Sequence, residues 1–271
     1  MAEENISQVT AIDIHSHLGQ DHGVISMADV QDGSSEYLLR TMGVANIGIS
    51  INTSRYAIMP RGSGYTVEGN RRLLEQIQNL PNVYGWVTID PHEPESFLQA
   101  EEMIHNPKML GLKIHPDEHE YDLQDYGDIL FSLADRLCVP LLGHSGSLRC
   151  LPETYCHFAN KYPNVKVIAA HLGSGPDGDP SHHIRAIEEN IHGNLYTDTS
   201  SAMSLLSNLL EYAVRRIGSN RILFGTDSSC YFSPCQRIRV DAAGIPYEDK
   251  YNILRENALN LFPKLKKELG V

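Results

Sequence analysis

Five histidines and one aspartate stand at or just beyond the ends of short apolar, β-branched runs of the sequence. They are His15, His17, His115, His144, His171 and Asp227. Imidazole nitrogens and carboxylate oxygens are ligands for Zn²⁺ and similar divalent ions. Because alternate residues of a strand share a face, His15 and His17 are expected to point the same way. The pattern therefore favours a metal site where several strands end.

The elements that would position these residues recur at a regular spacing. The apolar runs cover residues 11–15, 45–51, 83–89, 110–115, 139–144, 165–171, 194–198 and 221–227. Their starts lie roughly 30 residues apart, the length of one strand–helix unit. Between them, leucines and isoleucines recur at helical spacing, as in 73–80, 129–137 and 205–217. Eight strands that alternate with helices indicate a parallel sheet.

This order of elements fits either a closed barrel or an open, doubly wound sheet. A doubly wound sheet typically has a glycine-rich phosphate turn after its first strand, whereas this chain has His15-Ser16-His17 there. We therefore expect an α/β fold consisting of a single (β/α)₈ TIM barrel over residues 1–271. In such a barrel the carboxyl ends of the strands form the active face, so the six polar side chains would meet at its mouth.

Composition excludes several classes of function. A net charge of −12 and a pI near 5.5 argue against nucleic-acid and anionic-membrane partners. No apolar run reaches the ~18 residues of a membrane helix, and the opening MAEENISQVT lacks the features of a signal peptide. The five cysteines form no CxxC pair and are expected to be reduced. We expect a cytoplasmic protein with a small-molecule substrate, and a homodimer is compatible with the sequence.

The sequence resembles the amidohydrolase superfamily, specifically its amidohydrolase-2 branch. The similar segments are DIHSH at 13–17, GLKIHP at 111–116, GHSG at 143–146, AHLG at 170–173, FGTD at 224–227 and NALNLF at 257–262. The resemblance implies a (β/α)₈ barrel with a divalent metal, usually zinc, at its mouth. It implies His15, His17, His144 and Asp227 as ligands, and His171 as the group that polarises the substrate or holds a second metal. We expect one ion rather than two.

Lys113 is the unusual residue of this set. It shares a strand face with His115, so it points into the barrel if that face is inward. A buried lysine is costly unless it is paired, neutralised or modified. Binuclear relatives use a strand-four lysine carboxylated by CO₂ as a bridging ligand, so Lys113 and His171 could form a second metal site. The interpretation we favour is an unmodified Lys113 that contacts a substrate anion, with His115 beside it.

The function we expect first is metal-dependent hydrolysis of a small amide, ester or lactone. A divalent ion lowers the pKa of bound water to about 7. Asp227 would carry the proton to the leaving group, and His171 would stabilise the oxyanion. The alternative is a metal-dependent, non-oxidative decarboxylase of an aromatic or unsaturated carboxylic acid. Its carboxylate anchor would be Arg55, Arg61 or Arg149, in loops after the second and fifth strands.

Three further interpretations remain open at this point. A barrel that binds a metal without catalysis is disfavoured, because Asp227 and His171 would then have no role. Asp198 ends the seventh run, where it could orient a ligand histidine or cap the next helix. His182 and His183 open a helix and are expected to be solvated.

Overall fold

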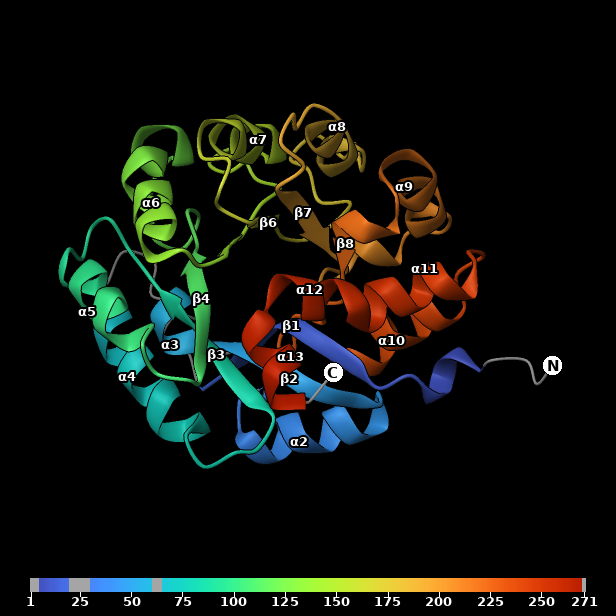
Figure 1. The fold of residues 1–271 in the computed structure, drawn as a ribbon, viewed down its shortest axis with the longest axis horizontal. Coiled ribbons are helices and arrows are strands. Elements are labelled where there is room, and N and C mark those ends of the chain that lie inside the picture. The colour runs from blue at the N-terminus through green and yellow to red at the C-terminus, as the bar shows by residue number, and fades with distance from the viewer. Residues whose placement is uncertain (1–4, 20–29, 60–64, 270–271) are drawn as a thin grey trace.

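Eight parallel strands form one sheet in which each strand pairs with the next in sequence (Figure 1). The computed structural model describes residues 5–19, 30–59 and 65–269. The strands are β1 (Ala11–Leu18), β2 (Ile47–Ser54), β3 (Val83–Thr88), β4 (Met109–Ile114), β5 (Leu141–Gly143), β6 (Val167–Ala169), β7 (Leu195–Asp198) and β8 (Ile222–Leu223). The last strand returns to the first, since Ile14 N donates to Phe224 O at 3.0 Å. The predicted (β/α)₈ barrel is confirmed.

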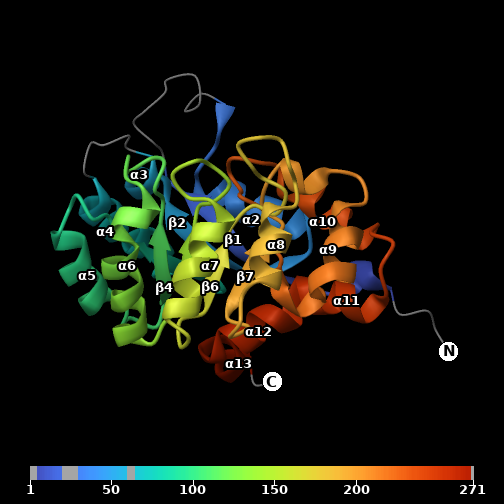
Figure 2. The ribbon, with the colours of Figure 1, turned by 90° about the horizontal axis from the view of Figure 1, so that it is seen from above.

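Helices surround this sheet, and the connections that follow the strands gather at one end of the barrel (Figure 2). Among the described residues, no helix combines the length and apolar character needed to cross a bilayer. The α-helices are α2 (Ser35–Val44), α3 (Arg55–Ile58), α4 (Thr66–Ile77), α5 (Glu95–Met103), α6 (Leu123–Leu137), α7 (Pro152–Lys161), α8 (His182–Glu188), α9 (Leu209–Ile217), α10 (Ser233–Asp241), α11 (Tyr247–Tyr251), α12 (Asn257–Leu261) and α13 (Pro263–Leu269). Shorter helical turns are η1 (Ile6–Gln8), η2 (Met203–Leu205), η3 (Ser219–Arg221) and the π-helical η4 (Asn252–Glu256).

Two clusters of apolar side chains stabilise the barrel. The larger one includes side chains of the sheet and of the surrounding helices. The smaller one joins strand residues to α12 and α13, which lie at the end opposite the loops that follow the strands (Figure 2). Trp86 is fully buried in this second cluster, where it packs edge-on against Phe262 and donates from Nε1 to Ile14 O at 2.8 Å. The interior of the barrel between β1 and α12 is therefore closely packed.

Several strands end at other residues than predicted, so that some of the predicted site residues lie in the loops after the strands instead of in the strands. β1 and β2 continue to Leu18 and Ser54, whereas β5, β6 and β8 end before His144, His171 and Asp227. His171 and Asp227 adopt φ angles of 74° and 54°, and this left-handed backbone is incompatible with a continuing strand.

One predicted helix is shorter than its apolar pattern. The segment 205–217 is α-helical only from Leu209, because Asn208 has a φ of 63° and separates α9 from the short turn η2. Gly218 ends that helix with a φ of 77°, as its position predicts.

Candidate metal centre

β1 carries two histidines into the mouth of the barrel. Its register against β2 shifts between Asp13 and Ser16. The side chains of His15 and His17 are both buried. His17 Nε2 lies 2.6 Å from Asp227 Oδ1, and His15 Nε2 lies 3.8 Å from the same oxygen. One donor atom from each of these three residues lies within 4.8 Å of the others. The structure thus brings together three of the four predicted ligands.

The imidazole of His15 is oriented by a carboxylate from the end of β7, two strands away around the barrel. Asp198 Oδ2 lies 2.8 Å from His15 Nδ1, and both side chains are buried. Burial alone would raise the pKa of Asp198, but His15, His171 and a hydrogen bond from Ser200 hold it well below its usual range. An ionised carboxylate can only accept, so Nδ1 carries the proton. The lone pair of His15 Nε2 therefore points into the cluster.

Contacts of two further side-chain groups, His17 Nδ1 and the Asp13 carboxylate, fix the first strand. The Nδ1 atom of His17 contacts the hydroxyl of Thr53 on β2. Asp13, buried below the two histidines, accepts backbone N–H bonds from His15 and Thr226, each at 3.1 Å. It also accepts bonds from the hydroxyls of Ser16 and Thr226. Burial raises the pKa of Asp13 to about 7 despite these bonds. Asp13 thereby joins β1 to the segment that carries Asp227.

Lys113 lies beside the donor cluster, as its strand face predicts. Its side chain is 1% exposed, and its Nζ lies 3.0 Å from His15 Nε2. Burial lowers the pKa of Lys113 to about 8, although Asp227 and Asp198 act in the opposite direction. Burial would raise the pKa of Asp227, but its hydrogen bond to His17 and the nearby imidazoles hold that pKa far below its usual range. An ammonium group and a carboxylate thus face the same buried space.

His171 and His144 form a pair at the edge of this space. His171 Nε2 lies 3.0 Å from His144 Nδ1, and His171 Nδ1 lies 2.8 Å from Ser200 Oγ. The ring centroids of His171 and His15 are 5.0 Å apart. The other nitrogen of His144, Nε2, lies 3.2 Å from Asp117 Oδ2. Within the described part of the chain, His144 is therefore not grouped with the donors of His15, His17 and Asp227.

The other residues that were candidates to contact a substrate anion do not gather at one point of the structure. His115 is buried and stacks on His144 with ring centroids 4.1 Å apart, while its Nδ1 accepts from Glu118 N at 3.3 Å. Arg149 is 42% exposed and lies 3.6 Å from Asp122. Arg61 lies outside the described residues.

Arg55 has a different environment from Arg149. It begins α3 directly after β2 and is 1% exposed. Its Nη1 donates to Ser229 Oγ at 3.2 Å, two residues beyond Asp227. This guanidinium is therefore buried between the loops that follow β2 and β8.

Sequence reasoning missed several polar residues near the mouth. Ser200 and Asp117 contact the two paired histidines, and only their positions after strand ends could have indicated them. The expectation that His182 and His183 are solvated is wrong, because both are buried. His183 Nε2 donates to Ala170 O at 2.8 Å.

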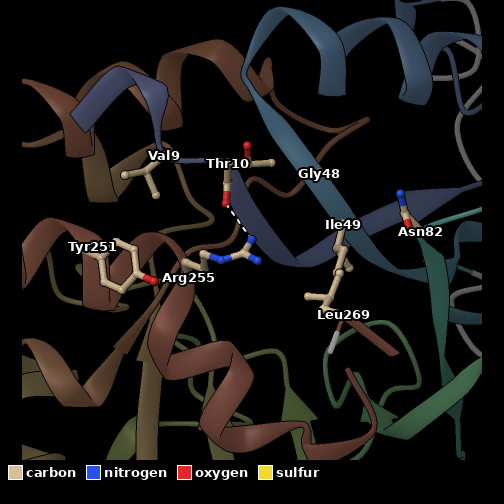
Figure 3. Close-up of a pocket in the computed structure, with 8 residues that line it drawn as sticks. All are labelled: Val9, Thr10, Gly48, Ile49, Asn82, Tyr251, Arg255 and Leu269. Carbon is tan, nitrogen blue, oxygen red and sulfur yellow. Dashed lines mark hydrogen bonds between the residues drawn. The ribbon is translucent and has the colours of Figure 1, made fainter. Parts of the chain in front are cut away.

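A separate pocket of about 450 Å³ lies at the other end of the barrel, near residues that precede β1 and β3 (Figure 3). Arg255 crosses it to donate from Nη1 to Thr10 O at 3.0 Å. None of the predicted site residues lines it. Its lining residues are Val9, Thr10, Gly48, Ile49, Asn82, Tyr251, Arg255 and Leu269.

The donor set at the mouth fits a divalent ion. Two neutral imidazole nitrogens and one carboxylate oxygen are ligands for Zn²⁺ and for neighbouring transition metals. Burial lowers the pKa of His17 to about 4, so this ring is neutral at physiological pH. Asp198 and Thr53 contact the outer nitrogens, as partners of metal-binding histidines generally do.

Comparison with known proteins gives a family and several related folds. A family model described as amidohydrolase matches residues 12–264. No curated protein sequence matches the chain. Similar structures include 2,6-dihydroxybenzoate decarboxylase from Rhizobium, with 15% identity over 93% of this chain and 98% of that chain and a TM-score of 0.71.

Two other similar structures are a second decarboxylase and a hydratase. One is 5-carboxyvanillate decarboxylase from Novosphingobium aromaticivorans, complexed with manganese and 4-hydroxy-3-methoxy-5-nitrobenzoic acid; it has 14% identity over 95% and 97% of the two chains and a TM-score of 0.72. The other is 4-oxalomesaconate hydratase from Rhodopseudomonas palustris, with 15% identity over 96% and 98% and a TM-score of 0.67. At these identities the likeness establishes a shared fold.

Proposed function

The chain belongs to the amidohydrolase family, and on that premise we propose that it is a metal-dependent decarboxylase of a small aromatic or unsaturated carboxylic acid. The observation that carries this proposal is the position of Lys113, which is buried beside the donor cluster with its Nζ 3.0 Å from His15 Nε2. A cation buried at the reacting centre favours an anionic substrate, because the substrate's charge offsets the cost of its burial.

Three arguments support decarboxylation over the hydrolysis that the sequence suggested first. Esters, lactones and amides are neutral at the bond that breaks, so they gain less from a buried ammonium than a carboxylate does. The related folds named above include decarboxylases of hydroxylated benzoates. Arg55 offers a second buried cation, close to the residues that follow Asp227.

We propose that His15, His17 and Asp227 hold one divalent cation. When bound, such an ion would attract the oxygen atoms of the substrate and stabilise negative charge that develops on them. The sequence suggested zinc, whereas manganese is bound in the related 5-carboxyvanillate decarboxylase. The donor set of two imidazoles and a carboxylate suits either ion.

The residues around this centre supply binding and a proton. Lys113 and Arg55 would bind the carboxylate and a neighbouring oxygen of the substrate. The reaction adds one proton to the carbon that bears the carboxylate, after which the carbon–carbon bond breaks, its electron pair stays on that carbon, and CO₂ leaves. We assign this proton to the pair of His171 and His144, whose facing nitrogens are 3.0 Å apart and share a hydrogen. The pair would donate from its singly protonated, imidazolium form and would be neutral after the transfer. Ser200 holds the other nitrogen of His171.

A substrate screen tests this assignment. The full chain, loaded with Mn²⁺ or Zn²⁺, would be incubated with hydroxybenzoates and unsaturated carboxylic acids, and separately with esters, lactones and amides of the same carbon skeletons. We expect release of CO₂ from at least one acid and no hydrolysis of the neutral compounds. Hydrolysis of an ester, lactone or amide without CO₂ release from any acid would overturn the proposal.

A further inference from the structure

We propose that the pocket at the end of the barrel opposite the mouth binds a small carboxylate with an apolar or aromatic body (Figure 3). Its volume of about 450 Å³ is typical of sites that hold small molecules. None of its lining residues belongs to the proposed metal centre. The inference therefore goes beyond the proposed function and does not depend on it.

Arg255 gives this pocket its charge. Among the described residues that line the pocket, it is the charged one, and its guanidinium forms no ion pair within the described part of the chain. The acidic residues next to lining residues in the sequence have other partners. Glu256 lies 3.5 Å from Lys266 Nζ, and Glu268 accepts a hydrogen bond from the hydroxyl of Tyr84. A guanidinium that has no carboxylate partner favours an anionic ligand.

A backbone contact holds this guanidinium across the pocket. Arg255 Nη1 donates to Thr10 O at 3.0 Å (Figure 3). Thr10 is fixed in turn, because its hydroxyl donates to Asn46 Oδ1 at 3.3 Å. The bond to Thr10 uses Nη1, so the N–H groups of Nε and Nη2 are available to a ligand. This edge of a guanidinium matches the two oxygens of a carboxylate and can donate two parallel hydrogen bonds to them.

The helix that carries Arg255 has an unusual geometry at this point. Residues Asn252–Glu256 form the π-helix η4, and Tyr251 immediately precedes it. Such π-helical turns are rare and occur frequently at functional sites. Figure 3 shows the Tyr251 hydroxyl directed toward Arg255. The phenol is therefore placed to donate a further hydrogen bond to an anion held by Arg255.

Apolar side chains form much of the remaining wall. Val9, Ile49 and Leu269 line the pocket. Ile49 is buried within the second core cluster, whereas Leu269 is 37% exposed, so the wall extends from the core to the surface. A ligand with an apolar body would remove this wall from water. Inorganic phosphate would not cover the wall, which is why we infer a carboxylate on an apolar body.

Diffraction from crystals of the full chain soaked in 4-iodobenzoate tests the site directly, because iodine is located by its anomalous signal. We expect an iodine peak between Val9, Ile49 and Leu269, with the carboxylate of the ligand on Arg255. This peak should be present whether or not a second one lies at the mouth. Iodine peaks that occur only elsewhere would overturn the proposal.

Calorimetric titration with 4-iodobenzoate measures the same site in solution. Lys113→Met lacks the buried cation of the mouth, and we expect it to retain this binding, so failure of the proposed function would not be mistaken for failure of the pocket. In that background Arg255→Met should weaken the affinity at least tenfold. Arg216→Met removes an exposed guanidinium that pairs with Glu188 and should leave the affinity unchanged. An unchanged affinity in Arg255→Met would contradict the assignment.

A change of ligand keeps the proposal testable if Arg255→Met does not fold. The uncharged 4-iodobenzamide retains the iodinated ring, and we expect it to bind Lys113→Met at least tenfold more weakly than 4-iodobenzoate. Equal affinities would show that the pocket does not recognise a carboxylate. Inorganic phosphate should also bind more weakly than 4-iodobenzoate, and tighter binding of phosphate would contradict the apolar body that we infer for the ligand.

Discussion

Asp198 Oδ2 lies 2.8 Å from His15 Nδ1, although 183 residues separate them in the chain. The same carboxylate accepts the backbone N–H of His171 at 2.9 Å through its other oxygen, Oδ1. One buried aspartate at the end of β7 therefore fixes the side chain of His15 on β1 and the backbone of His171 after β6. It also sets which nitrogen of His15 is available to a metal.

Replacement of this carboxylate should weaken metal binding. We expect Asp198→Asn to lower the affinity for Mn²⁺ or Zn²⁺ roughly 10- to 100-fold, the usual cost of losing a partner of a metal-binding histidine. Competition with a chromogenic chelator measures the affinity. Asp90→Asn replaces another buried aspartate, outside the donor cluster, and should leave the affinity unchanged. Equal affinities in wild type and Asp198→Asn would show that Asp198 does not support metal binding.

His183 should make the folded state sensitive to acid. Its Nε2 donates to Ala170 O, and its Nδ1 is buried without a partner among the described residues, so burial lowers its pKa from 6.5 to about 4. Below pH 6.5 the unfolded chain takes up a proton that the folded chain does not, so stability falls as the pH falls towards 4. This histidine alone would lower the free energy of unfolding by about 1.5 kcal/mol between pH 6.5 and pH 5.

Urea unfolding of two histidine variants isolates this contribution. The difference in unfolding free energy between wild type and His183→Gln should depend on pH in the stated direction, since glutamine does not titrate. His157→Gln, at an exposed position on α7, should show the same pH dependence as wild type. If His183→Gln follows the wild-type curve as well, the buried imidazole does not remain neutral.

Gly143 should tolerate no side chain. A Cβ at this position would overlap the phenol of Tyr155, whose hydroxyl donates to His144 O at 2.7 Å. We expect Gly143→Ala to destabilise the protein by about 1–3 kcal/mol through overpacking. Gly43→Ala is the matched control, because its Cβ meets no atom within 4 Å and lies in α2. There alanine should stabilise by up to about 1 kcal/mol. Equal melting temperatures for the two variants would contradict the tight packing under His144.

The sequence predicted the fold and most positions of the site for a physical reason. Apolar strands of a parallel barrel are buried on both faces, so they are visible as continuous runs, and the polar residue that ends each run marks the mouth. His15, His17 and Asp227 could therefore be grouped before any coordinates. The sequence places Asp198 at a strand end, but that position does not decide whether its side chain orients a ligand histidine or caps the next helix.

The remaining features depend on contacts between distant segments. His144 is directed to His171 and Asp117 by side chains that come from other loops, and no local pattern encodes that rotamer. The burial of His182 and His183 likewise depends on which face of α8 packs against the barrel. Histidine and aspartate are enriched at positive φ but adopt it in few positions, so the residue types of His171 and Asp227 do not by themselves predict that β6 and β8 end early.

Arg55 should contribute to substrate binding if the substrate is a carboxylate. We expect Arg55→Met to raise KM roughly 10- to 100-fold, the equivalent of about 1.5–3 kcal/mol for hydrogen bonds to a charged group. Metal content should not change. Arg149→Met should alter KM less, because Arg149 is 42% exposed and faces Asp122.

A surface variant completes this comparison. Arg136→Met removes an exposed guanidinium that pairs with Glu101 on α5 and should leave steady-state kinetics unchanged. A larger rise in KM for Arg149→Met than for Arg55→Met would indicate that Arg149, in the loop after β5, binds the substrate carboxylate instead of Arg55.

Anomalous diffraction from crystals soaked in Mn²⁺ tests the central claim most directly, since it locates the ion without reference to any reaction. We expect a peak within bonding distance of His15 Nε2, His17 Nε2 and Asp227 Oδ1. Saturating Mn²⁺ that produces no peak among these three atoms would contradict it.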